Sequence, residues 1–182
     1  GKTRSEYLSA ENVEEVRAKI AKRREIEKLI RPYVVRAVSK KADGAVKTGR
    51  ELADWADLVS GWDFREAFPK ILKFLRGRDE SRVLIVYGIR RTGKTTMLQQ
   101  AVRSLTREEF ASAAYIKVRT GDTLATMDAR LSRLHARGVK YVFVDEVTLM
   151  EEFIDGASLF SDVYATMGMK IVLSGTDSLG FW

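Results

Sequence analysis

A glycine-rich stretch near the middle of the chain, GIRRTGKTT (88–96), carries residues suited to binding phosphate groups. It fits the pattern G-x-x-x-x-G-K-[ST], in which backbone amides surround the phosphates, the lysine reaches the β- and γ-phosphates, and the hydroxyl group ligates magnesium. This chemistry assigns Lys94 to the phosphates and Thr95 to Mg²⁺. We expect the whole loop to bind the nucleotide: Gly88, Ile89, Arg90, Arg91, Thr92, Gly93, Lys94, Thr95 and Thr96.

Two arginines, Arg90 and Arg91, occupy the middle of this loop. That part of such a loop projects toward solvent and the phosphates, so a charged side chain is tolerated there. Two interpretations stay open. The arginines add positive potential over the bound phosphates, or they pair with acidic residues on a neighbouring element.

A pair of acidic residues, Asp145 and Glu146, ends the apolar run YVFV (141–144). Ligands of open α/β sheets bind at the carboxyl ends of the strands, so this pair is expected beside the phosphate loop. We expect Asp145 to hold Mg²⁺ together with Thr95, and Glu146 to act as the general base that deprotonates an attacking water. The alternative is an acidic helix cap without a catalytic role.

A third polar group follows the last apolar run of the chain, in the stretch SGTDS (174–178). Thr176 is the preferred candidate for a hydroxyl that senses the γ-phosphate, and Ser174, Asp177 and Ser178 are rivals. A turn rich in Ser, Thr and Asp is the structural alternative. The expected catalytic residues are therefore Glu146, Lys94 and Thr176.

Four short apolar runs, separated by helical patterns, form the framework for these groups. Strands that alternate with helices predict right-handed crossovers and a parallel sheet covered on both faces. The predicted fold is therefore α/β, a P-loop NTPase of three α/β/α layers. The expected strands are VLIVY (83–87), which reads as buried on both faces, AAYIKV (113–118), YVFV (141–144) and KIVLSG (170–175).

The first eighty residues carry helical patterns and no strand signal. A helix is predicted over 9–41, followed by a turn-rich link, KADGAVKTG (41–49). Thr48 and Glu51 fit a capping box that opens the next helix. The sequence thus predicts a helical region over 1–80 and a core domain over 81–182. Aromatic residues of this region, including Trp55, Trp62 and Phe64, are expected in its core rather than stacked on a base.

The composition narrows the classes of protein. The 182 residues include no cysteine and one histidine, so a thiolate or multi-histidine metal site is excluded. No signal or membrane-spanning segment is recognisable, which predicts a cytoplasmic protein. The net charge is +7, and residues 1–41 hold twelve Lys or Arg and six Glu. This segment is either a solvated helix with internal ion pairs or a basic arm for DNA or an acidic protein.

The motifs VYGIRRTGKTTML (86–98), YVFVDE (141–146) and KIVLSGTDS (170–178) together resemble the AAA-type P-loop ATPases, in particular a bacterial and archaeal group whose loops read YGxRRxGKTT. The resemblance implies that the strand at 170–174 lies between those at 83–87 and 141–144. Members of this family continue into a fifth strand and a helical lid, so we expect the chain to be a fragment. The segment VTLMEEFIDGAS (147–158) is longer than its family counterpart.

The expected function is Mg²⁺-dependent binding and hydrolysis of ATP that drives a conformational switch. No arginine follows Lys170 to act as a finger or lid sensor, so we expect slow turnover or none from this chain. One alternative is a nucleotide-gated module that binds DNA or protein, and a second is a small-molecule kinase. No guanine-reading NKxD is present, which favours ATP over GTP without deciding it. An oligomer is compatible with the sequence.

Overall fold

The computed structural model describes residues 44–78, 82–150 and 153–176. The chain divides into two compact units, residues 1–41 and 42–182, and all described residues belong to the second. The helix and the basic charge predicted before residue 42 therefore lie outside the described residues. So do Asp177 and Ser178, two of the rival γ-phosphate sensors.

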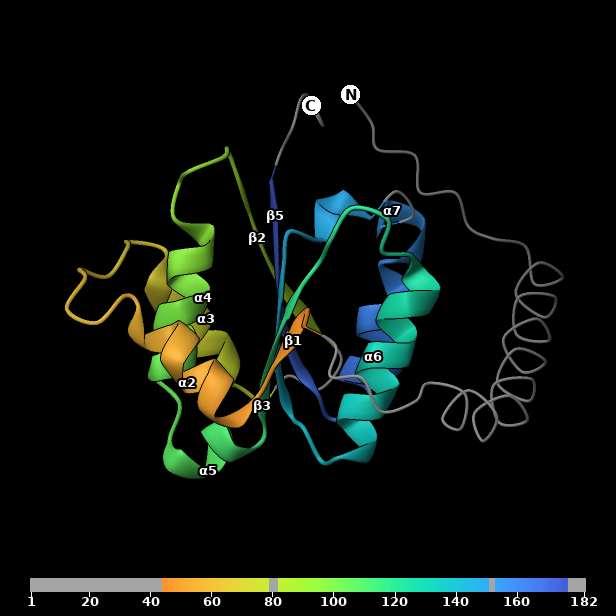
Figure 1. Ribbon diagram of the computed structural model, residues 1–182, viewed down its shortest axis with the longest axis horizontal. Coiled ribbons are helices and arrows are strands. Elements are labelled where there is room, and N and C mark those ends of the chain that lie inside the picture. The colour runs from red at the N-terminus through yellow and green to blue at the C-terminus, as the bar shows by residue number, and fades with distance from the viewer. Residues whose placement is uncertain (1–43, 79–81, 151–152, 177–182) are drawn as a thin grey trace, which may run out of the picture. The chain divides into compact units, whose positions relative to one another are not determined.

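A five-stranded sheet in the order β1-β3-β4-β5-β2 forms the middle of the second unit (Figure 1). The β2–β5, β5–β4 and β4–β3 pairs are parallel, as the alternation of strands and helices predicted. The order confirms that the last strand lies between the loop strand and the strand that ends in Asp145. The strands are β1 (Val46–Lys47), β2 (Val83–Gly88), β3 (Ala113–Lys117), β4 (Tyr141–Asp145) and β5 (Lys170–Thr176).

The expectation that the first eighty residues hold no strand is wrong. Val46 and Lys47 form β1, which pairs antiparallel with Ile116 and Tyr115 of β3 and makes the sheet mixed. A two-residue strand is too short to leave an alternation of apolar and polar residues in the sequence, so only its pairing reveals it. Its position at the edge fixes the chain that enters α2 against the sheet.

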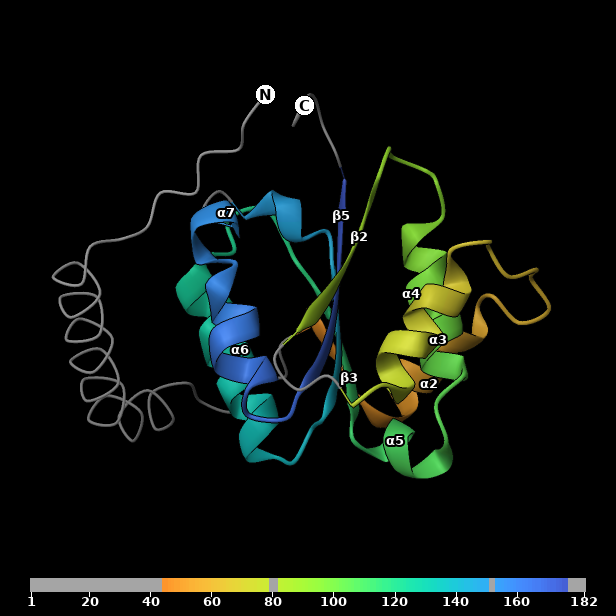
Figure 2. The same cartoon turned by 180° about the vertical axis from the view of Figure 1, so that it is seen from behind.

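Helices cover both faces of the sheet, which gives the predicted three layers (Figures 1 and 2). Helices α2, α3, α4 and α5 lie on one face, and α6, α7 and the π-helix η2 lie on the other. Among the described residues, every helix is too short or too polar to reach across a lipid bilayer. The bounds are α2 (Gly49–Asp57), α3 (Phe68–Arg76), α4 (Lys94–Arg103), α5 (Arg107–Ala111), α6 (Leu124–Ala136), the 3₁₀-helix η1 (Val147–Leu149), α7 (Phe153–Gly156) and η2 (Leu159–Ala165).

Helices α2 and α3 share a hydrophobic core with the helix that follows the phosphate loop. Leu52 of α2 and Ile71 of α3 are buried in one cluster with Leu98 and Val102 of α4. The division into domains at residue 80 stays a prediction, but this packing ties the described helices before that residue to the phosphate-loop core. Residues 49–76 are therefore placed to influence the site.

The helix caps differ from those predicted. Thr48 precedes α2, but its side chain makes no capping hydrogen bond, so the predicted capping box is wrong. A complete capping box instead opens α5, where the Thr106 hydroxyl accepts from the backbone of Glu109 and the Glu109 carboxylate accepts from the backbone of Thr106. The sequence reading missed α5, whose five residues are too few to show a helical period.

Four exposed side chains correct the predicted core. Strand β2 is an edge strand, and its Ile85 and Tyr87 are 39% and 50% exposed, so it is not buried on both faces. Trp62 and Phe64 lie in the link between α2 and α3 and are 60% and 66% exposed. Their apolar character suggested a core position, but only one side of Phe64 is covered, by the ring of Phe68 at 4.5 Å between centroids.

Candidate functional site

The loop between β2 and α4 turns back on itself through two residues of left-handed backbone. Arg91 has φ 64° and Gly93 has φ 83°, a conformation that glycine adopts without strain. Gly93 is the N-cap of α4, and its carbonyl accepts from the backbone of Met97 at 2.9 Å. The first amides of a helix lack partners inside the helix, so α4 presents donors to an anion at this end.

Lys94 lies inside the curve of this loop and is only 8% exposed. Its ammonium group donates to the carbonyls of Gly88 and Ile89, at 2.7 Å each. Burial lowers the pKa of Lys94, and the negative charges of Asp145 and Glu146 oppose that shift. An ammonium group has three donors, so these two bonds leave one for a phosphate oxygen.

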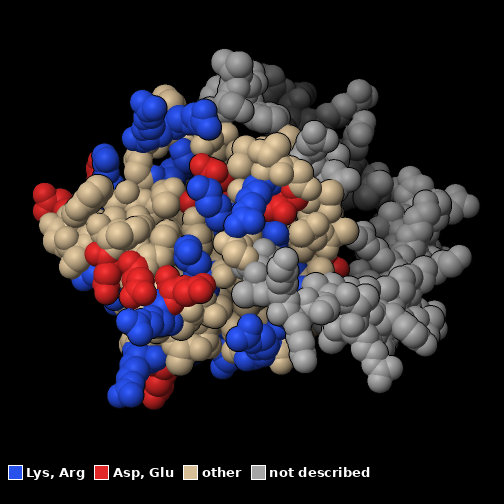
Figure 3. Space-filling model, viewed as in Figure 1, with Lys and Arg blue, Asp and Glu red and all other residues tan. Residues whose placement is uncertain are grey.

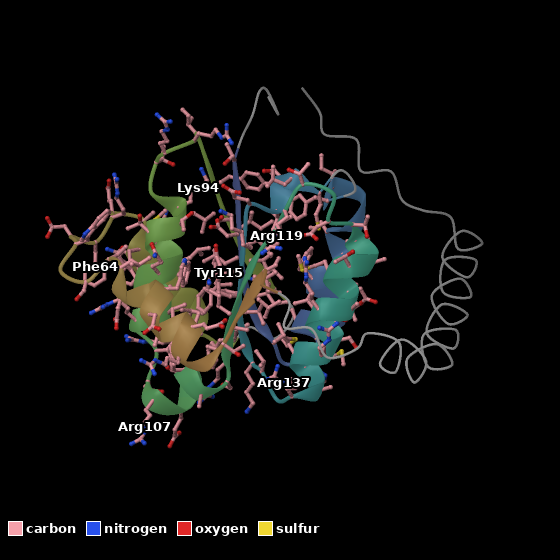
Figure 4. All side chains as sticks on the ribbon, in the orientation of Figure 1. Phe64, Lys94, Arg107, Tyr115, Arg119 and Arg137 are labelled. Atoms are coloured by element: carbon pink, nitrogen blue, oxygen red, sulfur yellow. The ribbon has the colours of Figure 1, made fainter. Side chains whose placement is uncertain are left out.

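Asp145 is the last residue of β4 and is 2% exposed. Its carboxylate accepts hydrogen bonds from three hydroxyl groups. Its Oδ2 accepts from the hydroxyls of Thr95 at 2.8 Å and Tyr115 at 3.1 Å. Its Oδ1 accepts from the hydroxyl of Ser174. The structure thus brings Thr95 and Asp145 together, as the two motifs predicted. Figure 4 shows Lys94 at the pocket end of α4 and Tyr115 between the sheet and the helices of that face.

Sequence reasoning missed Tyr115 as part of this site. Tyr115 pairs in register with Phe143, two residues before Asp145, so Tyr115 and Asp145 lie on the same face of adjacent strands. Burial raises the pKa of Tyr115, and the charge of Asp145 adds to the shift. A polar hydroxyl in the apolar run AAYIKV was the available signal, because a buried tyrosine hydroxyl needs a hydrogen-bond partner.

Ser174 is buried against Asp145 rather than lining the pocket. It was a rival γ-phosphate sensor, but it is fully buried and donates to Asp145. Thr176, the preferred candidate, lies at the end of β5 in register with Gly88 and lines the pocket. Its backbone N–H donates to the hydroxyl of Thr148 at 3.2 Å, which fixes the end of the strand.

Glu146 has left-handed backbone, with φ 61° and ψ 39°. Such a conformation is uncommon for a residue other than glycine and costs about 1–3 kcal/mol, so it requires support from its surroundings. Its N–H donates to the hydroxyl of Ser174 at 3.4 Å. The sharp turn at Glu146 leads β4 directly into η1 and lets two consecutive acidic residues line one pocket.

The pocket formed by these groups has a volume of about 500 Å³. Arg90 and Arg91 line it, a position compatible with the first of their two interpretations, positive potential over bound phosphates. Figure 3 shows Lys and Arg side chains at this end of the second unit, with others spread over the same face. The lining residues are Arg90, Arg91, Gly93, Lys94, Thr95, Thr96, Asp145, Glu146 and Thr176.

Three residues of the loop stay outside the pocket walls. Gly88 and Ile89 offer their carbonyls to Lys94, and the hydroxyl of Thr92 donates to the carbonyl of Ile89 at 2.8 Å. Their interactions hold the curve of the loop. A second pocket of about 440 Å³ adjoins the first at Thr96 and is otherwise lined by Gly61, Trp62, Asp63, Phe64 and Arg65.

The oxygen donors of the site suit magnesium. The Thr95 hydroxyl and the Asp145 carboxylate are hard oxygen ligands, and they lie 2.8 Å apart beside the phosphate loop. No cluster of three or more His, Cys, Asp or Glu exists among the described residues. Mg²⁺ commonly binds through one or two protein oxygens together with substrate phosphates and water, so this small donor set fits it.

Comparison with known families identifies part of the chain. A family model described as "AAA domain" matches residues 80–181, more than half of the 182 residues. No curated protein matches the chain. The matched segment contains the phosphate loop, the strand that ends in Asp145 and the strand that ends in Thr176. The chain therefore belongs to the AAA-domain family of P-loop ATPases, whose members bind nucleotides.

Proposed function

We propose that this protein binds ATP with Mg²⁺ and hydrolyses it, and that turnover drives a conformational switch. One observation carries the proposal: the Thr95 hydroxyl lies 2.8 Å from the Asp145 carboxylate in the wall of the phosphate-loop pocket. These two groups come from distant parts of the sequence. Their convergence beside Lys94 supports one site for a metal-bridged triphosphate.

The roles of the residues follow from their positions. The amides at the start of α4 and the third donor of Lys94 bind phosphate oxygens, and Thr95 and Asp145 hold the metal ion. Bound Mg²⁺ neutralises charge on the β- and γ-phosphates. The oxygen of a water molecule attacks the γ-phosphorus, and Glu146 accepts a proton from that water. The bond between the γ-phosphorus and the β–γ bridging oxygen breaks, which gives ADP and phosphate. Thr176 donates to the γ-phosphate.

Titration with a fluorescent ATP analogue and Mg²⁺ tests nucleotide binding. We expect Lys94→Ala to weaken binding at least about tenfold, because a hydrogen bond from a charged donor contributes about 1.5–3 kcal/mol. Lys140→Ala, which removes an exposed lysine outside the pocket, is the matched control and should bind as the wild type does. Equal affinities of Lys94→Ala and Lys140→Ala would contradict the proposed site.

The second pocket offers a place for the nucleoside. It meets the first at Thr96, and Trp62 and Phe64 present exposed rings to it. Stacking of a base on an aromatic ring contributes about 1–3 kcal/mol. We therefore place the base there, which revises the earlier interpretation of both rings as core. Quenching of Trp62 fluorescence by ATP, with no quenching by inorganic triphosphate, is the expected result.

Two alternatives stay open. A glutamate beside the metal-holding Asp145 favours hydrolysis over phosphoryl transfer to an acceptor, and release of free phosphate rather than acceptor phosphorylation tests this. The basic segment 1–41 motivates binding of DNA or an acidic protein. Affinity for duplex DNA that falls steeply with salt, and is lost without residues 1–41, would support a DNA-binding module. Slow turnover, a cytoplasmic location and oligomerisation stay predictions from the sequence.

A further inference from the structure

Tyr115 donates a hydrogen bond to Asp145 from outside the pocket. The other two hydroxyls on this carboxylate come from the phosphate loop and from β5, whose ends form the site. Tyr115 comes from the middle of β3, is 2% exposed and does not line the pocket. Its hydroxyl nevertheless donates to Asp145 Oδ2, the oxygen that also accepts from Thr95. It therefore acts on the nucleotide only through Asp145.

The ring of Tyr115 is held by helix α2. Trp55 stacks on it, with ring centroids 3.9 Å apart and an angle of 29° between the ring planes. The carbonyl of Trp55 accepts from the side chain of Gln99 at 2.8 Å, and Gln99 belongs to α4, the helix that begins at Lys94. Two routes thus connect α2 to the site, one through Tyr115 to Asp145 and one through Gln99 along α4.

Gln100, the neighbour of Gln99, connects α4 to the link between α2 and α3. Gln100 donates to the carbonyls of Trp62 at 3.3 Å and Asp63 at 3.0 Å, in the link that lines the second pocket. Gln99 and Gln100 are 6% and 3% exposed, so both are committed to these contacts rather than to solvent. Gln99 and Gln100 therefore connect α4 to α2 and to the link that follows α2. Trp55 of α2 in turn stacks on the ring of Tyr115.

We propose that Tyr115 is a positioning residue for Asp145 and that α2 sets its position through Trp55. The inference rests on the proposed function, because it assigns Asp145 to the metal ion. A carboxylate on a short side chain rotates unless its oxygens are held, and here Oδ1 has one donor and Oδ2 has two. Partners that orient a metal ligand in this way typically contribute about 10–100-fold to metal affinity or activity.

Replacing Tyr115 by Phe tests the role of the hydroxyl. The variant removes one oxygen and keeps a ring for Trp55. We expect the Mn²⁺ concentration that half-saturates the ADP-bound protein, measured by electron paramagnetic resonance, to rise about tenfold or more. Binding of ADP in EDTA should stay unchanged, because Tyr115 does not line the pocket. A destabilised structure without a positioning role would instead weaken both.

Tyr141→Phe is the matched control. The Tyr141 hydroxyl also donates to a carboxylate, that of Glu109 at 3.2 Å, and neither residue lines the pocket. The Tyr141→Phe variant should therefore bind Mn²⁺ as the wild type does. Equal Mn²⁺ affinities for Tyr115→Phe, Tyr141→Phe and the wild type would refute the positioning role and leave the proposed function intact. A wild-type chain that binds no Mn²⁺ with ADP would refute both.

A double-mutant cycle tests the part played by α2. We expect Trp55→Ala to raise the half-saturating Mn²⁺ concentration severalfold, and Trp55→Phe, which keeps a stacked ring, to raise it less. In the Tyr115→Phe background, Trp55→Ala should have a clearly smaller effect, because the hydroxyl through which it acts is gone. Additive effects would refute the route from α2 through Tyr115. Thermal unfolding of each variant shows whether it is folded.

Discussion

The buried carboxylate of Asp145 is held by three hydroxyls, whereas its neighbour Glu146 lines the pocket on a strained turn. Both acids line the pocket, so this difference in how they are held supports the separate roles proposed for them, although they are adjacent in sequence. A carboxylate that is fixed by several donors suits a metal ligand, and one that reaches into the pocket suits proton transfer. The separation depends on the left-handed backbone at Glu146, which turns the chain between the two side chains.

We expect Glu146→Gln to slow hydrolysis by about 10²–10⁴-fold, because it removes the base and keeps the shape of the side chain. Affinity for Mg²⁺ and ATP should change little. A single-turnover assay with excess protein measures both, and it accommodates the slow turnover expected from the sequence. Glu108→Gln replaces an exposed glutamate on α5 and is the control. Equal rates for the two variants would exclude Glu146 as the base.

At the scale of elements, the junctions between strands and helices decide what reaches the site. Helix α4 begins at Lys94 because Gly93 turns the chain, and β5 ends at Thr176 against Thr148 of η1. Gly175 is needed there, since a Cβ at this position would lie 2.9 Å from the Thr148 methyl carbon and 3.0 Å from the Tyr87 ring. These junctions place the ends of three strands around one pocket.

Helix α5 gives a prediction on pH and stability. The N–H of Thr106 is the largest of the influences that lower the pKa of Glu109 below 4.5. A depressed pKa means that the charged form stabilises the fold, so the contribution is present above the unfolded pKa and is lost as the pH falls through the folded one. We expect Glu109→Gln to lower the melting temperature at neutral pH and to approach wild type as the pH falls below 4.5.

Thermal unfolding measured from neutral to acidic pH checks this expectation. Glu109 is partly exposed, so solvent screens its charge and the effect at neutral pH should be modest. Glu108→Gln, in the same turn of α5 but outside the capping box, is the control. A destabilisation by Glu109→Gln that stays constant down to acidic pH would mean that the charge of Glu109 is not its cause.

At the scale of the molecule, α2 and α3 are not a separate attachment to the phosphate-loop core. They share a hydrophobic cluster with α4, and α2 is connected to the carboxylate of Asp145 through Trp55 and Tyr115. A movement of this helical pair would therefore move groups that hold the nucleotide. This arrangement gives the proposed conformational switch a route from the site to the surface, along the link that carries Trp62 and Phe64.

Binding should stabilise residues 42–182 as one unit. We expect Mg²⁺ and ATP at about 100 times the dissociation constant to stabilise the fold by about 2.7 kcal/mol, a rise of about 5–10 °C in melting temperature. Differential scanning fluorimetry measures the shift. Lys94→Ala binds at least about tenfold more weakly, so at the same nucleotide concentration it should be stabilised by at most about 1.4 kcal/mol, about half of the wild-type shift. A wild-type melting temperature that does not respond to saturating Mg²⁺ and ATP would contradict nucleotide binding in this unit.

The sequence by itself determined the phosphate loop, the four main strands and the acidic pair. Each of these is a local pattern, a glycine spacing or an apolar run with its flanking residues, so it can be read without neighbours in space. The family resemblance added that the strand at 170–174 lies between those at 83–87 and 141–144, which the structure confirms. The meeting of Lys94, Thr95 and Asp145 in one pocket was predictable, because each residue lies in a recognisable motif at the end of a strand.

Only the tertiary structure decided how Asp145 is held and which residues before the loop take part. Tyr115 is 30 positions from Asp145, and Gln99 is 44 positions from Trp55. Contacts over such separations depend on strand register and helix packing, which leave no periodic signal in one sequence. The same reason explains why β1, the exposure of Trp62 and the burial of Ser174 were not foreseen: each depends on what another segment covers.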